Sequence, residues 1–197
     1  MRLGVTNEKA LCSPESRIGM INAVFYGSRQ CSSPEFGKAI MRESLLKSFQ
    51  GPDGRPRLID ALISQPLIRD KDLAAAVEPH LKLEAIFEGT NLIKQGASDT
   101  DLFLILSGGF SVAINGRIVA RKEAGEHVGE MAVVDPLTPR SASVTATSDS
   151  VVARIEEPDF SALADRYPRL WRRIARELAS RLRDGNSADR EKAGHAA

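Results

Sequence analysis

The chain has 197 residues, which is enough for one domain with a good core and an appendage but tight for two full domains. Its 27 lysines and arginines balance 26 aspartates and glutamates, so no overall positive field draws it to nucleic acid or to an anionic membrane. The amino-terminal residues lack the apolar core of a signal peptide, and the longest apolar runs are only about five residues. These features predict a cytoplasmic protein without a membrane span.

Residues 1–54 are interpreted as an amino-terminal extension of unknown function, because Ser-Pro and Gly-Pro pairs interrupt them repeatedly. Met41 would make a plausible natural start, so residues 1–40 are expected to be weakly ordered. Cys12 and Cys31 lie in this extension with no CxxC pair and no neighbouring histidine. We therefore expect free thiols and no metal site.

From Arg57 onward the pattern changes to helices, then short strands, then helices. Apolar spacing predicts one helix around 58–63 and a second over 71–80. An Asn115-Gly116 pair between two β-rich runs predicts a type I′ hairpin. So many short strands predict an α+β, mainly β fold: a β-roll or jelly roll of about eight strands flanked by N-terminal and C-terminal helices. The β-rich segments are 84–88, 91–94, 102–106, 110–114, 117–122, 141–147 and 151–155.

Two proline-initiated helices are predicted to close the domain, one from Pro158 and a longer one from Pro168. The arginines of the longer helix are interpreted as a solvated face, and Gly185 as its C-terminal stop before a polar tail of residues 185–197. The helix is expected to be the part that moves, because it is attached through a short joint. Its apolar stripe is expected to pack on the roll, a second subunit or a ligand, and consists of Trp171, Ile174, Ala175, Leu178 and Leu182.

The segment Gly129–Ala132, followed eight residues later by Arg140-Ser141, has the chemistry of a sugar-phosphate site. Gly129 allows the backbone to approach a phosphate closely, and the next amides can begin a short helix whose N-terminus favours an anion. Glu130 can accept a hydrogen bond from a ribose hydroxyl. Arg140 offers a planar charged fork for two phosphate oxygens, and Ser141 adds a hydroxyl donor.

At these residues the chain resembles the cyclic-nucleotide-binding domain family, whose phosphate-binding cassette reads Gly-Glu-hydrophobic-Ala, a short loop, then Arg-Ser/Thr-Ala-hydrophobic. The similarity continues at 92–96 with Asp99, at 102–108 and at 155–160, and covers about residues 57–183. It implies a binding domain over 55–184. The resemblance also implies that a 3′,5′-cyclic mononucleotide contacts Gly129, Glu130, Met131, Ala132, Arg140 and Ser141.

The function implied by this resemblance is that of a regulatory sensor rather than an enzyme. No nucleophile with a base, no paired carboxylates and no metal set are recognisable, so no catalytic residue and no cofactor are predicted. The ligand is expected to be cUMP, cAMP, cGMP or cCMP. Residues 49–58, 124–132 and 167–175 look like the sensor half of bacterial anti-phage effectors of the Pycsar type, in which a cyclic pyrimidine nucleotide activates a TIR domain that degrades NAD.

This second resemblance implies control of a fused or partner effector, with a homodimer as the expected assembly. The alternative is a catabolite-activator-like sensor that acts through protein partners. Only 13 residues follow Asp184 in this sequence, too few for the DNA-reading domain of that family, so no specific DNA binding is expected.

Two other functions fit the same pattern less well. A cupin-like enzyme needs histidine and glutamate metal ligands in two clusters, and three scattered histidines do not supply them. A purely structural oligomerisation module would have no use for the Glu130 and Arg140 pair. His127 is expected to line the edge of the roll, with ligand contact as the alternative, and Trp171 is expected to pack rather than to stack on a base.

Overall fold

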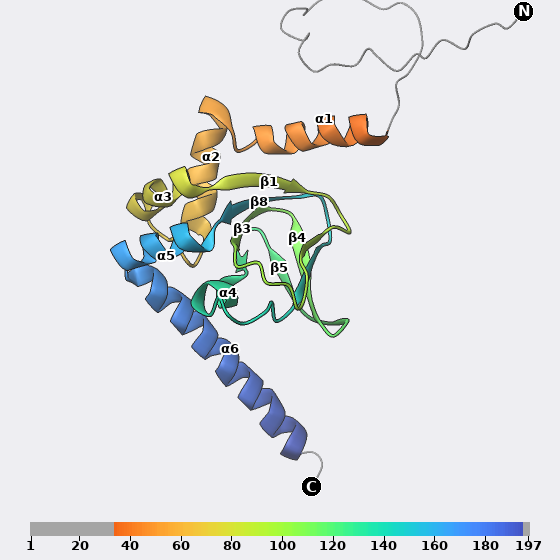
Figure 1. The fold of residues 1–197 in the computed structure, drawn as a ribbon, viewed down its shortest axis with the longest axis vertical. Helices are drawn as coiled ribbons and strands as arrows, with labels where there is room; N and C mark the ends of the chain where they lie inside the picture. The colour runs from red at the N-terminus through yellow and green to blue at the C-terminus, as the bar shows by residue number, and fades with distance from the viewer. Residues whose placement is uncertain (1–33, 195–197) are drawn as a thin grey trace, which may run out of the picture. The chain divides into compact units, whose positions relative to one another are not determined.

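The computed structural model describes residues 34–194, and the side chains of 37–183 (Figure 1). The predictions for Cys12, Cys31 and the first 33 residues therefore lie outside the described residues. Within the described part, helices surround a β-roll and one short helix interrupts its strands. The helices are α1 (Pro34–Lys47), α2 (Gly51–Ser64), α3 (Lys71–Val77) with the 3₁₀ turn Glu78–His80, α4 (Glu130–Val134), α5 (Glu157–Arg166) and α6 (Arg169–Gly194).

Two antiparallel four-stranded sheets form the roll, with strand orders β1-β8-β3-β6 and β2-β7-β4-β5. This confirms the predicted mainly β roll flanked by helices. The strands are β1 (Lys82–Ile86), β2 (Asn91–Ile93), β3 (Leu102–Ser107), β4 (Gly109–Ile114), β5 (Arg117–Glu123), β6 (His127–Val128), β7 (Ser143–Ala146) and β8 (Ser150–Ile155).

The β4–β5 connection is the predicted hairpin. Asn115 and Gly116 have φ angles of 51° and 78°, and Ile114 lies opposite Arg117 in the ladder. Positive φ at both central residues is the requirement of a type I′ turn, and asparagine and glycine meet it at low cost. The hairpin brings β5 back along β4 to form one edge of its sheet.

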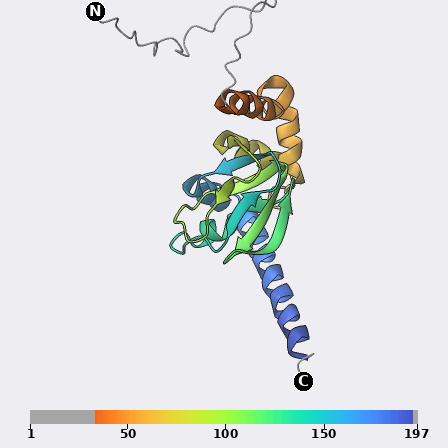
Figure 2. The ribbon, with the colours of Figure 1, turned by 90° about the vertical axis from the view of Figure 1, so that its right-hand side faces the viewer.

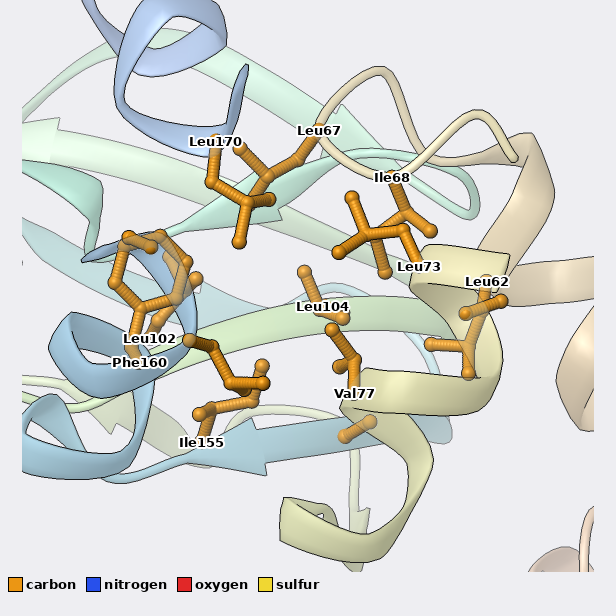
Figure 3. Close-up of a cluster of buried hydrophobic side chains, with 14 of the residues drawn as sticks. Leu62, Leu67, Ile68, Leu73, Val77, Leu102, Leu104, Ile155, Phe160 and Leu170 are labelled. Carbon is orange, nitrogen blue, oxygen red and sulfur yellow. The ribbon is translucent and has the colours of Figure 1, made fainter. Parts of the chain in front are cut away.

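Strand β3 separates two apolar clusters, because its successive side chains point to opposite faces. Phe103 and Ile105 pack inside the roll. Leu102 and Leu104 pack on the other face among side chains from the helices, as Figure 3 shows with Leu62 and Phe160 nearby. The helices are therefore anchored to the same strand that pairs with β6, immediately before the cassette.

Four details differ from the sequence predictions. Helix α1 begins at Pro34, within residues 1–40 that were expected to be weakly ordered, and the two-residue strand β6 was missed. The predicted stop at Gly185 is wrong, since α6 continues to Gly194 and extends beyond the strands in both views (Figures 1 and 2). One glycine inside a helix costs only about 1 kcal/mol, which its neighbours can outweigh. Leu182, predicted in the packed stripe, is 69% exposed.

Other parts of the C-terminal prediction agree with the structure. Trp171 packs edge-on against Phe160, with ring centroids 5.6 Å apart, so its role is packing. The interpretation of the α6 arginines as a solvated face is wrong for Arg173, which donates to the carbonyl oxygens of Leu67 and Ile68. Within the part of the chain that the structure describes, no helix is long and apolar enough to cross a membrane.

Candidate functional site

Gly129 joins β6 to α4 and is the N-cap of this short helix, with φ of 93°. A Cβ atom built on it would lie 2.6 Å from the carbonyl oxygen of Asp101 and 2.8 Å from Nη1 of Arg140. Only glycine therefore allows the chain to turn at this point and leaves room for Arg140. The amide of Ala132 donates to the carbonyl of Gly129 at 3.2 Å, so it is engaged within the turn rather than directed to a ligand as predicted.

The Arg140 side chain is almost fully buried and held by four hydrogen bonds. Nε and Nη2 both donate to one carboxylate oxygen of Asp99, Nη2 also donates to the carbonyl of Asp101 at 2.8 Å, and Nη1 donates to the carbonyl of Gly129 at 3.3 Å. The Nε–Nη2 edge of the fork is thus occupied. A guanidinium carries five N–H groups, and the fifth, on Nη1, has no partner among residues 37–183, whose side chains the structure describes. The predicted grip on two phosphate oxygens by the whole fork is therefore reduced to Nη1.

All six predicted site residues line one pocket of about 450 Å³, which we call the cassette pocket. This volume lies within the range of roughly 300–1,000 Å³ that is usual for small-molecule sites. Strands β2, β4, β5, β6 and β7 contribute apolar side chains to this pocket, and α6 contributes Arg181. The apolar wall consists of Ile93, Val112, Ile114, Val119, Val128 and Val144.

Glu130 is only 3% exposed, and its carboxylate accepts a hydrogen bond from Nη1 of Arg181. Nη2 of the same guanidinium donates to Glu177, one helical turn earlier, at 2.5 Å. Burial lowers the pKa of Arg181, but the charges of Glu130 and Glu177 raise that pKa above its usual value. The guanidinium therefore carries its charge into the pocket. Sequence reasoning missed this residue, although the i, i+4 spacing of Glu177 and Arg181 was a readable signal for their pairing.

His127 lies two residues before the cassette glycine and is 2% exposed. Its Nε2 atom is 3.0 Å from the second carboxylate oxygen of Glu177, and Lys122 is 4.0 Å from the other. Burial raises the pKa of Glu177, but hydrogen bonds and charges from His127 and Arg181 outweigh it and lower the pKa to about 2. A line of contacts therefore runs from His127 through Glu177 and Arg181 to Glu130.

Glu177→Gln is expected to destabilise the protein near neutral pH, and the difference from wild type should shrink as the pH falls from 4.5 toward 2. The sign follows from the lowered pKa: a carboxylate stabilised in the folded state contributes stability above its unfolded pKa, and that contribution is lost on protonation. Urea unfolding of both proteins, from neutral pH down to the lowest pH at which they fold, measures this difference. A difference that does not change with pH would show that the Glu177 charge is not what matters.

A second pocket, of about 500 Å³, lies between α6, the α2–α3 connection and the end of β5; we call it the helix pocket. Arg69, Arg173 and Arg176 line it together with His127 and Glu177. It shares His127 and Lys122 with the cassette pocket. Arg173 already donates to two carbonyl oxygens, and Lys122 pairs with Glu126 at 2.8 Å. Two of the cations of the helix pocket therefore already have partners within the protein.

The chain is similar in sequence to several known proteins. Residues 84–167 match the family model described as "Cyclic nucleotide-binding domain". Over 75% of its length the chain is 40% identical to Pycsar effector protein BcPycTIR of Burkholderia cepacia, and over 72% it is 39% identical to Pycsar effector protein PaPycTIR of Pseudomonas aeruginosa. The matches cover 50% and 46% of those proteins, so the chain spans about half the length of these relatives.

Solved structures of other proteins have a similar fold. The catabolite activator protein of Thermus thermophilus superimposes with a TM-score of 0.58 at 27% identity, covering 63% of this chain and 61% of that one. A cyclic nucleotide-binding domain from Methylobacillus flagellatus superimposes with a TM-score of 0.60 at 22% identity, covering 74% and 93%. The roll and its flanking helices are thus a known arrangement.

Proposed function

Because residues 84–167 belong to the cyclic nucleotide-binding domain family, we propose that the chain binds a 3′,5′-cyclic mononucleotide in the cassette pocket as a regulatory sensor. One observation carries the proposal: a buried acid, Glu130, and a buried base, Arg140, line the same small pocket. A cyclic nucleotide has one anionic group, its phosphate, and one free ribose hydroxyl. Each would have a partner of matching chemistry here, which offsets the cost of removing it from water.

The position of Arg140 suits the phosphate although most of its hydrogen bonds are made within the protein. Asp99 and the Asp101 carbonyl hold the guanidinium in place, so it needs no reorganisation when a ligand arrives. Its free Nη1 hydrogen and its permanent charge remain for the anion. The Ser141 hydroxyl donates to the Met131 sulfur at 3.5 Å, and it would add a further donor for the phosphate by turning toward the ligand.

The base of the nucleotide would lie along the part of the apolar wall that β4 and β5 form. Val112, Ile114 and Val119 present carbon surface there, and Arg121 lies on the same strand as Val119. Carbon surface accepts purines and pyrimidines alike, so cUMP, cAMP, cGMP and cCMP all remain candidates.

We further propose that ligand binding controls an effector, in a cytoplasmic homodimer. The relatives named above are effector proteins, and this chain aligns with only about half of each. An anti-phage role is the corresponding proposal for its biology. The likeness to a catabolite activator protein supports a second candidate, a sensor that acts through protein partners. The domain is a regulatory fold, and the absence of specific DNA binding stays a prediction.

The proposal is tested by a thermal-shift panel with cyclic AMP, GMP, UMP and CMP, and with the linear 5′-monophosphates as controls. A cyclic nucleotide at a hundredfold excess over its dissociation constant should add about 2.7 kcal/mol of stability, which is easily measured. At least one cyclic nucleotide is expected to raise the melting temperature more than its linear counterpart. No shift with any of the four would refute the proposed function.

A further inference from the structure

We infer that Arg181 is an internal competitor for the ribose acceptor, so that its contact with Glu130 and the contact of a nucleotide with Glu130 exclude each other. The inference rests on the proposed function and names the regulation of the same site. Arg181 would then have two effects. It lowers the affinity of the pocket for the nucleotide, and it makes that affinity depend on the position of α6.

The competition follows from the position of the two groups. Glu130 and Arg181 both line the cassette pocket, and the guanidinium donates directly to the carboxylate. A ribose hydroxyl must approach a carboxylate oxygen to about 2.5–3.0 Å to form its hydrogen bond. The carboxylate is otherwise buried, so the approach is from the pocket, where the guanidinium stands. A ribose that binds the carboxylate oxygen held by the guanidinium, Oε1, has to displace Arg181 from it.

The contact also attaches one turn of α6 to the cassette. Ile174 is fully buried against the roll and Leu178 is partly buried, but Leu182 is 69% exposed. Apolar packing of the helix thus ends before the turn that carries Arg181, and this residue joins that turn to the roll by charge. Glu177 keeps the guanidinium in this position and is itself held by His127.

Displacement of Arg181 therefore has a mechanical result. A ribose bound to Glu130 supplies a hydrogen-bond donor in place of the guanidinium, and it releases the α6 turn at residue 181 from the cassette. The helix before Leu178 stays packed, so the change is confined to the last turns. Binding of the ribose therefore makes the end of α6 more mobile, and an effector in contact with that end could respond to the change.

The test compares dissociation constants for wild type, Arg181→Met and the control Arg172→Met, an exposed arginine on the same helix. The probes are cyclic AMP and cyclic UMP, each with its 2′-deoxy analogue, which lacks the only free ribose hydroxyl. Arg181→Met should bind the ribonucleotide about fivefold more tightly, the scale of a partly exposed ion pair. It should not gain for the 2′-deoxy form, and Arg172→Met should match wild type.

Glu177→Gln provides a second variant if Arg181→Met folds poorly, because it removes the charge that positions Arg181 and leaves the arginine present. It should give a smaller gain in affinity with the same dependence on the 2′ hydroxyl. Amide hydrogen exchange of wild type should become faster around residue 181 when the ribonucleotide binds.

The possible outcomes distinguish failure of the proposed function from failure of the competition. If no cyclic nucleotide binds wild type, the proposed function fails. If a nucleotide binds but Arg181→Met binds it equally or less tightly, or gains equally for the 2′-deoxy form, the competition is refuted and Arg181 shares the carboxylate with the ribose.

Discussion

Arg140→Ala is expected to weaken nucleotide binding severely. The substitution removes the buried guanidinium of Arg140 from the pocket lining, and with it the Nη1 donor and the permanent charge beside the cassette turn, while the carboxylate of Asp99 remains. Truncation of one member of a buried charge pair costs roughly 2–5 kcal/mol, which corresponds to a loss of affinity between about thirtyfold and several thousandfold. The Asp101 carbonyl loses its Arg140 donor and the Gly129 carbonyl keeps only the Ala132 amide, so stability should fall as well.

Calorimetric titration measures this loss, with circular dichroism to show that each variant is folded. Arg140→Lys keeps the charge but cannot bond Asp99 and the two carbonyls at once, so it should bind weakly rather than not at all. Arg117→Ala is the matched control, because Arg117 is exposed at the hairpin and is not among the residues lining the cassette pocket. A folded Arg140→Ala protein with wild-type affinity would show that the ligand does not bind in this pocket.

Gly129→Ala is expected to be nearly as damaging, for a steric reason. The added methyl group would lie 2.6 Å from the Asp101 carbonyl oxygen and 2.8 Å from Arg140 Nη1, well inside contact distance. The φ angle of 93° is itself unfavourable for alanine. The turn has to shift and Arg140 has to move with it, so binding should be lost together with a few kcal/mol of stability.

Gly96→Ala separates these two causes. Gly96 has a similar φ angle of 82°, but nothing lies within 4 Å of a Cβ atom built there. It therefore reports the strain of the backbone alone, which is of order 1 kcal/mol. Thermal melts and titrations of both variants give the comparison. Equal effects of the two substitutions would mean that close contact at the cassette contributes nothing.

The parts of the site that could be predicted are those determined by local sequence. Gly129, Glu130 and Arg140 carry their chemistry in residue type and spacing, and the Asn115-Gly116 turn follows from the φ angles these residues tolerate. Strand positions followed from short apolar runs between turn residues. These features depend on neighbours in the chain, which a sequence shows directly.

The parts that could not be predicted depend on tertiary contacts. Nothing in the spacing of α6 shows that Arg181 reaches the cassette, 51 residues away, while Arg172 stays in solvent. Two of the four hydrogen bonds of Arg140 go to Asp99, 41 residues away, and this pairing also arises only on folding. Strand β6 has two residues, too few to give a period, and it exists because β3 pairs with it.

The central claim, that a cyclic nucleotide binds between Glu130 and Arg140, is tested most directly by a crystal structure of the complex. The crystals should contain the cyclic nucleotide with the largest thermal shift. We expect a phosphate oxygen within hydrogen-bond distance of Arg140 Nη1 and the ribose 2′ hydroxyl bonded to Glu130. A nucleotide bound instead in the helix pocket, beside Arg69 and Arg176, with Glu130 and Arg140 untouched, would contradict the account.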